Sequence, residues 1–338
     1  MSKVAAMGEI MLRLSPSGNQ RFVQANSFEA SYGGAEANVA VLLAQLGMEA
    51  YFVTRLPNNQ IGQAAAAELR RYGVNTQYIV HGGERIGIYF LENGTSVRPS
   101  KVIYDRANSS MSEATADDFD FAQIFKNCGW FHFTGITPAL SARAAELTLQ
   151  ACRQAKSAGI PVSCDINYRS SLWSKVEAGK CLAPLMEYVD VCITNPEQAE
   201  DVFAIRAHGE KNALVETEWF SDIAGQLIRR FGFKKVAFTQ RQNISACDNI
   251  LSAHLCCGGK CITSKKYPVH ILDRVGGGDA FAAGMIYGIL HHLSDEETIE
   301  FASAANAFKH TVHGDFCLAS VDEILALAHG DGQGRIQR

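Results

Sequence analysis

Residues 273–288 read DRVGGGDAFAAGMIYG, in which three consecutive glycines stand directly before an acidic residue. Glycine has no Cβ, so the backbone at Gly276, Gly277 and Gly278 can turn tightly and bring successive N–H groups toward one point. The small, apolar residues after Asp279 predict a buried helix that begins at this turn. Unpaired N–H groups and the helix dipole both favour an anion at a helix N-terminus. We therefore predict an anion-binding turn beside Asp279, whose carboxylate the dipole should keep ionised.

A carboxylate next to an anion-binding turn is the arrangement that phosphoryl transfer requires. In that chemistry one group orients the attacking hydroxyl and accepts its proton, while donors neutralise the charge on the transferring oxygens. Asp279 would be the first group, and the glycine N–H groups would be the donors. A purely structural interpretation stays open, because Asp279 can equally be a helix N-cap residue after a flexible turn. The glycine motif alone does not decide between the two.

Outside this stretch, strand-like apolar runs alternate with helical patterns along most of the chain. Residues 130–136 (WFHFTGI) precede a helical pattern at 141–159, and residues 189–195 (VDVCITN) precede another at 196–205. Such alternation is typical of βαβ units and of a largely parallel sheet with helices on both faces. We therefore expect one α/β domain over residues 1–338.

Two segments break this alternation. The residues from about 13–31 and about 76–106 are rich in β-forming side chains and show no helical period. We predict that they form a few antiparallel strands outside the main sheet, as a small β-lid over one mouth of the domain. Paired lids often serve as dimer surfaces, so we also expect a homo-oligomer that forms through the lid.

The composition excludes several classes of function. Hydrophobic residues make up 47% of the chain and charged residues 20%, and the formal net charge is -4. Such a chain can bury a large core, and it carries no basic surface for nucleic acid or an acidic membrane. No leader-like segment opens the chain, and no apolar run approaches the roughly 18 residues that a membrane span needs. We expect a cytoplasmic protein that binds a small molecule.

The cysteines give no sign of disulfides. The chain has 10 of them, without any C-x-x-C pair, and several lie in apolar strand-like runs, which favours reduced core residues. Cys256, Cys257 and Cys261 form the only cluster that could bind a metal, but their spacing fits no common zinc motif. The alternative for this cluster is a β-hairpin. We therefore predict no dedicated protein metal site.

A second glycine-opened helix lies near the other end of the chain. Residues 31–47 read SYGGAEANVAVLLAQLG, which places Gly33 and Gly34 just before a buried helical pattern and Asn38 one turn into it. A backbone without Cβ atoms can approach a ligand closely, and Asn38 offers it an amide. Tight packing would also explain these glycines. Together with residues 273–288, the motif resembles the two signatures of the ribokinase-like (PfkB-type) sugar kinases, and the resemblance runs nearly end to end.

This resemblance implies a ribokinase-like fold of three α/β/α layers with a small β-sheet lid. In that family the first glycine turn, here Gly33 and Gly34, lies under the sugar. The second turn forms the anion hole, and its Asp, here Asp279, is the catalytic base. The usual D-T-x-G-A-G-D reads DRVGGGD, so Gly277 replaces Ala, which we expect to loosen the turn without removing an N–H. The implied cofactors are ATP and the Mg²⁺ that the nucleotide carries, and dependence on a monovalent cation stays open.

Within the family, six motifs in the same order resemble the 2-keto-3-deoxygluconate kinases. They are residues 8–16 (GEIMLRLSP), 33–47 (GGAEANVAVLLAQLG), 165–173 (DINYRSSLW), 273–284 (DRVGGGDAFAAG), 309–316 (KHTVHGDF) and 330–338 (GDGQGRIQR). Neutral-sugar relatives often carry an Asp near the position of Arg13, where it would repel an acid. Planar arginine forks suit a carboxylate or a phosphate. The resemblance implies substrate contacts from Tyr89, Tyr104, Arg106, Arg169 and Asp315.

These residues also have structural interpretations. Tyrosines in lid strands can simply pack across a sheet, and an arginine after a strand often pairs with a surface acid. The resemblance, more than the residues themselves, favours Arg106 and Arg169 as ligands.

The nucleotide side departs from the family pattern. The frequent T-x-G strand end reads TQR, so Arg241 would substitute charge for a backbone contact near the phosphates. The N-x-x-E element reads NPEQ, with Gln198 where Glu is common, which weakens the expected magnesium shell unless Glu197 or Glu200 contributes. The implied nucleotide contacts are Asn167, Arg169, Asn195, Thr239, Arg241 and Asn306.

The expected activity is an ATP-dependent transfer of phosphate to the 6-hydroxyl of 2-keto-3-deoxygluconate. One alternative keeps this chemistry with a neutral sugar such as fructose or ribose. Another is a non-catalytic sugar or nucleotide sensor on a kinase scaffold, which the Gln198 and TQR departures allow. The sequence does not separate the gluconate from the galactonate epimer.

Overall fold

The computed structural model describes residues 3–209 and 215–330. A large sheet runs through the middle of the molecule, with the order β13-β12-β11-β10-β9-β8-β1-β4-β5, and β14 pairs with β12. In this order, the seven strands β11, β10, β9, β8, β1, β4 and β5 are parallel to one another, whereas β12 is antiparallel to its neighbours. Their bounds are β1 (Lys3–Met7), β4 (Glu49–Leu56), β5 (Ile79–His81), β8 (Cys128–Thr134), β9 (Val162–Asp165), β10 (Val191–Thr194), β11 (Lys235–Asn243), β12 (Asp248–Cys257), β13 (Lys260–Thr263) and β14 (Tyr267–His270).

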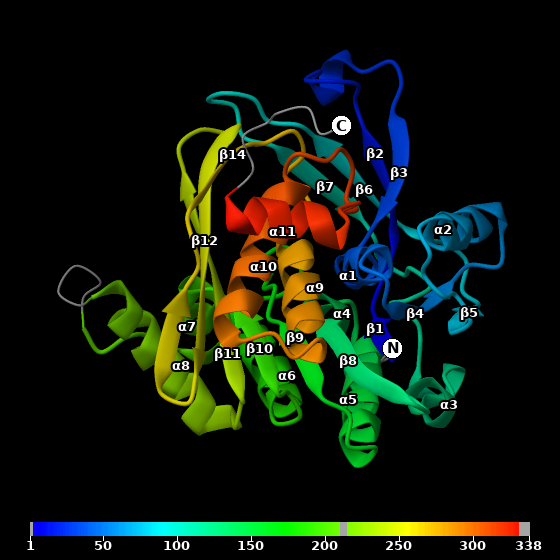
Figure 1. Ribbon diagram of the computed structural model, residues 1–338. Coiled ribbons are helices and arrows are strands. Elements are labelled where there is room, and N and C mark those ends of the chain that lie inside the picture. Colours follow the sequence, from blue (N-terminus) through cyan, green and yellow to red (C-terminus); the bar gives the residue numbers. More distant parts are fainter. Residues whose placement is uncertain (1–2, 210–214, 331–338) are drawn as a thin grey trace.

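Helices cover both faces of this sheet (Figure 1). Alternate residues of β1 show why: Val4 and Ala6 belong to one apolar cluster, whereas Ala5 and Met7 belong to the other. The first cluster joins the sheet to α1 (Ala35–Gln45), α2 (Gln60–Arg71), α9 (Gly277–Leu290), α10 (Asp295–Lys309) and α11 (Val321–His329). The second joins it to α3 (Phe121–Phe125), α5 (Ala142–Ser157), α6 (Lys175–Met186), α7 (Pro196–Phe203) and α8 (Glu216–Phe231). The expected three-layer α/β/α fold is confirmed for the described residues; residues 1–2, 210–214 and 331–338 of the expected domain lie outside them.

The small residues of α9 are explained by its central position. This helix packs against α10, and a Cβ on Gly284 would lie 2.6 Å from the Cα of Ala302. Gly288 is similarly close to Thr298. The run AFAAGMIYG therefore lets two buried helices approach closely, and this contact fixes where the N-terminus of α9 lies.

A separate small sheet forms the predicted lid, with the order β3-β2-β6-β7. Its strands are β2 (Met11–Ser15), β3 (Glu29–Gly33), β6 (Gly87–Glu92) and β7 (Lys101–Asp105), seen at the top of Figure 1. The expectation of antiparallel strands is confirmed for the β2–β3 and β6–β7 pairs, but it was wrong for the central pair, because β2 pairs with β6 in parallel. Strand β2 follows the carboxyl end of β1, and β6 follows the carboxyl end of β5. Because β1 and β5 run in the same direction in the main sheet, β2 and β6 also run in the same direction.

The predicted lid boundaries were also too wide. Residues 79–81 are strand β5, which pairs with β4 at the edge of the main sheet. The residues between β2 and β3 contain a short 3₁₀ helix, Phe22–Gln24, instead of a strand. Periodicity cannot assign a short strand such as β5 to one sheet or the other, because the assignment depends on its long-range partner.

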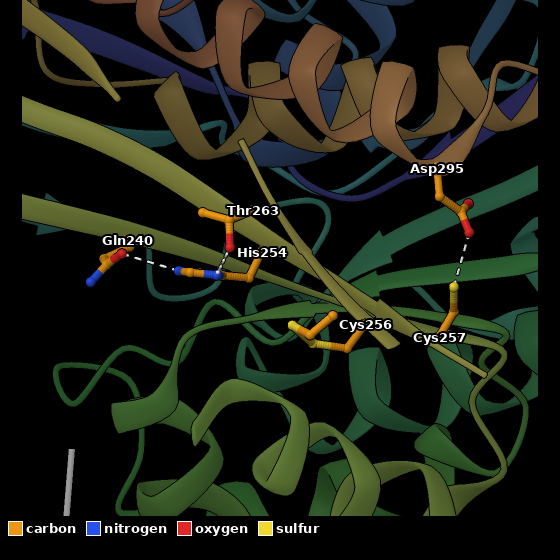
Figure 2. The surroundings of a disulfide bond; sticks show 7 residues. Gln240, His254, Cys256, Cys257, Thr263 and Asp295 are labelled. Atoms are coloured by element: carbon orange, nitrogen blue, oxygen red, sulfur yellow. Dashed lines mark hydrogen bonds between the residues drawn. A yellow bond between two sulfur atoms is a disulfide. The ribbon is translucent and has the colours of Figure 1, made fainter. Parts of the chain in front are cut away.

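The expectation that all cysteines are reduced was wrong for one pair. Cys256 and Cys261 form a disulfide, and the other eight cysteines are free. The two residues face each other across the β12–β13 hairpin with their Cα atoms 4.1 Å apart, so the hairpin interpretation of this cluster is confirmed. In Figure 2 the Cys257 side chain points toward Asp295, and its Sγ donates a hydrogen bond to Oδ2 over 2.9 Å. Among the residues that the structure describes, no group of His, Cys, Asp and Glu side chains could hold a metal ion.

No helix within the described ranges is both long and apolar enough to cross a membrane.

Candidate active site

One cavity of about 850 Å³ lies where the lid meets the carboxyl ends of the parallel strands. Lid residues Tyr89 and Tyr104 line it together with Asp165 at the end of β9 and Thr194 at the end of β10. Ligands of open α/β sheets bind at this edge of the strands. The predicted site residues that line the cavity are Gly34, Asn38, Tyr89, Tyr104, Arg106, Asn167, Arg169, Asn195, Thr239, Arg241, Gly276, Gly277, Gly278, Asp279, Asn306 and Asp315.

Gly33 is the predicted site residue that does not line this cavity. Its small size serves packing, because a Cβ there would lie 2.0 Å from Oδ2 of Asp315. Gly34 lines the cavity, yet a Cβ there would also lie 1.9 Å from the carbonyl oxygen of Glu9. The packing explanation for the first glycine turn is therefore correct, and the turn makes room for two groups at the cavity wall.

The second glycine turn forms the N-terminus of α9 as predicted. Gly276 is the N-cap residue, with φ 86°, a left-handed conformation that favours glycine. Ala280 N donates to Gly276 O over 2.9 Å and opens the helix. The structure shows no acceptor for the N–H groups of Gly277 and Gly278 among the described residues. Two donors at a helix N-terminus thus remain open toward the cavity.

The replacement of Ala by Gly277 has a packing reason. A Cβ on Gly277 would lie 2.4 Å from Cε1 of His310 and 2.8 Å from Oδ1 of Asn306. The expectation that this glycine merely loosens the turn was therefore wrong: the His310 ring fills the space that an alanine would take. His310 is fully buried, and its Nδ1 donates to the Asn306 carbonyl over 2.7 Å.

Asp279 lies in the first turn of α9, and its carboxyl is held from the opposite helix. Asn38 Nδ2, on α1, donates to Asp279 Oδ2 over 2.6 Å, while Asn38 Oδ1 accepts from Gly34 N. Asn38 therefore orients the carboxyl, a role that its motif did not reveal. The sequence led us to expect an ionised Asp279, but burial raises its pKa to about 7. The Asn38 bond and Arg169 lower the pKa, whereas Asp165 and Glu36 raise it, and burial is the largest of these effects.

Two of these carboxyls, Asp165 and Glu36, were missed by the sequence analysis. Asp165 ends β9 and lines the cavity, and burial raises its pKa to about 6 although Arg169 opposes the shift. Glu36 accepts hydrogen bonds from Thr134 N, Thr134 Oγ1 and Thr137 Oγ1, and burial raises its pKa. Both lie inside quoted motifs, DINYR and GGAEAN, so their proximity to glycine and arginine was the available signal.

On the lid side, Arg13 is fixed between two carboxylates. Its Nη2 donates to Asp273 over 2.6 Å and its Nη1 donates to Asp315 over 2.8 Å. Burial alone would lower the pKa of Arg13, but Asp315 and Asp273 raise it well above its ordinary value. Tyr89 Oη donates to the other oxygen of Asp315 over 2.5 Å. Arg13 therefore links lid strand β2 to Asp273, which precedes the anion-binding turn, and to Asp315, which follows α10.

Arg106 is also paired. Its Nε donates to Glu9 Oε2 over 2.9 Å, and its Nη2 bonds the same oxygen. The Cζ of Arg106 lies 5.5 Å from the centre of the Tyr104 ring, and Tyr104 faces Tyr89 across the β6–β7 pair. Glu9, which the sequence analysis did not name, lines the cavity, and its Oε1 is buried without a partner in the described part of the chain. The tyrosines thus pack across the sheet and line the cavity at once.

The nucleotide side contains mostly predicted residues. Thr239 and Arg241 lie on β11 and line the cavity. Asn195 caps α7, where its Oδ1 accepts from Gln198 N over 2.8 Å, so part of this side chain serves the helix. Glu197 and Glu200 line the cavity. Asn306 Oδ1 is buried without a partner among the described residues. Arg274, from the opening stretch, was missed although it also lines the cavity.

Comparisons with known proteins agree with this geometry. The sequence pattern of the pfkB family carbohydrate kinases matches residues 1–317. The chain belongs to the pfkB family of carbohydrate kinases.

Three relatives cover most of the chain. The crystal structure of 2-dehydro-3-deoxygluconokinase from Thermotoga maritima is 50% identical and has a TM-score of 0.94, covering 98% of this chain and 100% of that one. The 2-dehydro-3-deoxygalactonokinase of Haloferax volcanii is 32% identical over 98% of both chains. The 2-dehydro-3-deoxygluconokinase of Bacillus subtilis is 26% identical over 86% of this chain and 84% of its own length.

Proposed function

We propose that this protein transfers a phosphate from ATP to the 6-hydroxyl of 2-keto-3-deoxygluconate (2-dehydro-3-deoxygluconate). The observation that carries the proposal is a buried carboxyl, Asp279, whose pKa is raised to about 7 beside N–H groups that remain open. A base with a pKa near the working pH accepts a proton well, and about half of it is ionised there. The names of the relatives from Thermotoga maritima and Bacillus subtilis support this substrate.

In this proposal each residue of the chain has a defined task. Asp279 orients the 6-hydroxyl and takes its proton, and Asn38 holds the carboxyl in place. The N–H groups of Gly277 and Gly278 stabilise the charge that develops on the phosphoryl oxygens. Tyr89, Tyr104, Arg106 and Asp315 bind the sugar acid from the lid, and lid closure excludes water, which would otherwise compete as acceptor.

The residues present fit a nucleotide that brings its own Mg²⁺. The cavity has carboxylates at Asp165, Glu197 and Glu200, but the described residues contain no cluster that would hold a metal alone. Bound ATP supplies the phosphoryl group, and Mg²⁺ neutralises part of its charge. Asn167, Asn195, Thr239, Arg241 and Asn306 are the proposed nucleotide contacts. We also propose a cytoplasmic location, where ATP is available, and pairing of chains through the lid.

The galactonate epimer is a second candidate substrate, because a relative 32% identical to this chain is named 2-dehydro-3-deoxygalactonokinase. The test is a coupled assay of ADP release with both epimers, fructose and ribose as acceptors. We expect kcat/KM for the preferred sugar acid to exceed that for fructose and ribose by roughly 10- to 100-fold, the effect of a lost charge-assisted contact. A preference for a neutral sugar would contradict the proposed substrate. Binding of sugar without ADP release would indicate a sensor.

A further inference from the structure

In the described chain, four arginines line the cavity without an ion pair: Arg169, Arg206, Arg241 and Arg274. Three of these, Arg169, Arg241 and Arg274, also act on one another through their charges. Arg169 follows β9, Arg241 lies on β11, and Arg274 precedes the glycine turn, so three separate elements bring them together. In the described ranges no carboxylate forms an ion pair with any of them, although fifteen ion pairs occur elsewhere, from Arg13 to His313. Arg274 Nη2 donates to the carbonyl of Ala246 over 3.0 Å.

The three positive charges are close enough to repel one another. Burial lowers the pKa of Arg241, and the charges of Arg274 and Arg169 lower it further. Arg241 is exposed to solvent, yet it lines a concave cavity whose walls surround it with protein atoms. Like charges that converge in a cavity are unfavourable unless an anion neutralises them. The arrangement therefore indicates a ligand with several negative charges.

Other groups place these arginines around the anion-binding turn. His310, which packs against Gly277, has its pKa lowered to about 4 by burial, with Arg241 and Arg274 among the contributing charges. On the other side, Arg169 lowers the pKa of Asp279. The charge of Arg169 thus acts on both Asp279 and Arg241.

In the described chain, the acids that line the cavity form no ion pair with these three arginines, although the charge of Arg169 lowers the pKa of Asp165 and Asp279. Asp315 is already paired with Arg13, and Glu9 is paired with Arg106. Gln198 stands where the family pattern commonly has Glu, so the phosphate side has lost an acid while Arg241 and Arg274 add two cations. Both changes make this part of the cavity more positive.

We propose that Arg241 and Arg274, together with Arg169, form a guanidinium clamp that binds the terminal phosphates of a nucleoside triphosphate. This proposal rests on the proposed function, since it describes how the chain holds the nucleotide that donates the phosphate. The clamp recognises the polyphosphate chain, so affinity rises with the number of phosphates, and it supplies positive charge even in the absence of Mg²⁺. Inorganic tripolyphosphate, which has no nucleoside, should therefore bind in the same place.

The test compares Arg241→Gln and Arg274→Gln with the wild type by isothermal titration calorimetry in EDTA. Each charge-assisted contact contributes about 1.5–3 kcal/mol, so each variant should bind ATP and tripolyphosphate roughly 10- to 100-fold more weakly, with AMP affinity unchanged. Arg241→Lys and Arg274→Lys should keep part of the affinity. Arg229→Gln, an exposed position on α8, is the matched control for net charge and should bind as the wild type does.

Two results would overturn the clamp: equal losses for AMP and ATP, or unchanged affinity for tripolyphosphate in both glutamine variants. Failure of the proposed function gives a different result. If the wild type bound tripolyphosphate through these arginines but did not bind ATP, the clamp would stand as an anion site and the ATP-dependent kinase would be contradicted.

Discussion

The two ends of the cavity differ in whether their arginines are paired with acidic residues. On the lid side, Arg13 and Arg106 are 2% and 9% exposed, and buried acids pair with both. On the phosphate side, Arg169, Arg241 and Arg274 face the cavity without such partners in the described chain. A charge that the protein itself neutralises fixes structure, because removing it leaves its partners buried and unpaired. A charge without a partner is available to a ligand.

This difference changes the interpretation of the two arginines that the sequence analysis treated alike. Arg106 and Glu9 together carry no net charge, so a substrate carboxylate would share Arg106 with Glu9. Arg169 brings a full positive charge close to Asp279. The lid side should therefore select the shape and hydroxyl pattern of the sugar acid, whereas the phosphate side should provide most of the attraction for anions.

The largest effect is expected where the two regions meet, at Asp279. Asp279→Asn removes the proton acceptor and keeps the side-chain shape, so kcat should fall roughly 10²- to 10⁴-fold. Binding at both ends should persist, because neither set of arginines depends on this carboxylate for its partners. Steady-state kinetics and calorimetry with each substrate measure the two effects separately. Unchanged turnover would remove Asp279 as the base.

Next in size is the effect of the buried ion pairs on stability. Arg13→Met leaves Asp273 and Asp315 buried without their cation, and breaking a buried pair costs about 3–5 kcal/mol in free energy of unfolding. Arg241→Gln removes the same charge from the phosphate side and should change this free energy by less than about 0.5 kcal/mol. Urea unfolding of both variants measures the difference. Equal destabilisation would show that the contrast between the two regions is not real.

The sequence predicted the layers of the fold because apolar strand-like runs alternate with helical patterns along the chain. Strands β1, β9 and β10 are buried at every position, as expected for a parallel sheet covered on both faces. The helices around the glycine turns were equally visible, since α1 and α9 are apolar all round. The partner of β5 and the direction of β2 relative to β6 were not predictable, because both depend on contacts between distant segments.

The candidate site shows the same division between local and distant information. The motifs identified residues that line the cavity, but they could not show that Arg13 pairs with Asp315, which lies 302 residues away. Neither could they give the pKa of Asp279, which depends on Asp165 and Glu36 from two other elements. Gly277 looked like a loosened turn because the His310 side chain that fills its space is not adjacent in sequence.

A smaller effect on stability is expected from substitutions in the glycine turn, where tight packing, and no ion pair among the described residues, holds the phosphate side in place. A Cβ on Gly277 would overlap His310, so Gly277→Ala should cost about 1–3 kcal/mol of stability. Gly278 is the matched control, because the nearest atom to a Cβ there is Oδ2 of Asp165 at 3.9 Å. Gly278→Ala should be neutral or slightly stabilising, since alanine favours a helix. Thermal unfolding compares the two, and equal melting temperatures would contradict tight packing at Gly277.

The smallest effect concerns the acids between the two regions. The pKa of Asp279 is raised from an ordinary value of 3.8 to about 7, so the base is protonated below that pH and kcat/KM should rise as pH increases through about 7. Asp165 contributes to this raised pKa through its negative charge. Asp165→Asn should therefore lower the apparent pKa of the kcat/KM profile, by less than about one unit. Titration of the ATP phosphates would give the same midpoint in both proteins, so only a shift between the two profiles identifies Asp279 as the titrating group.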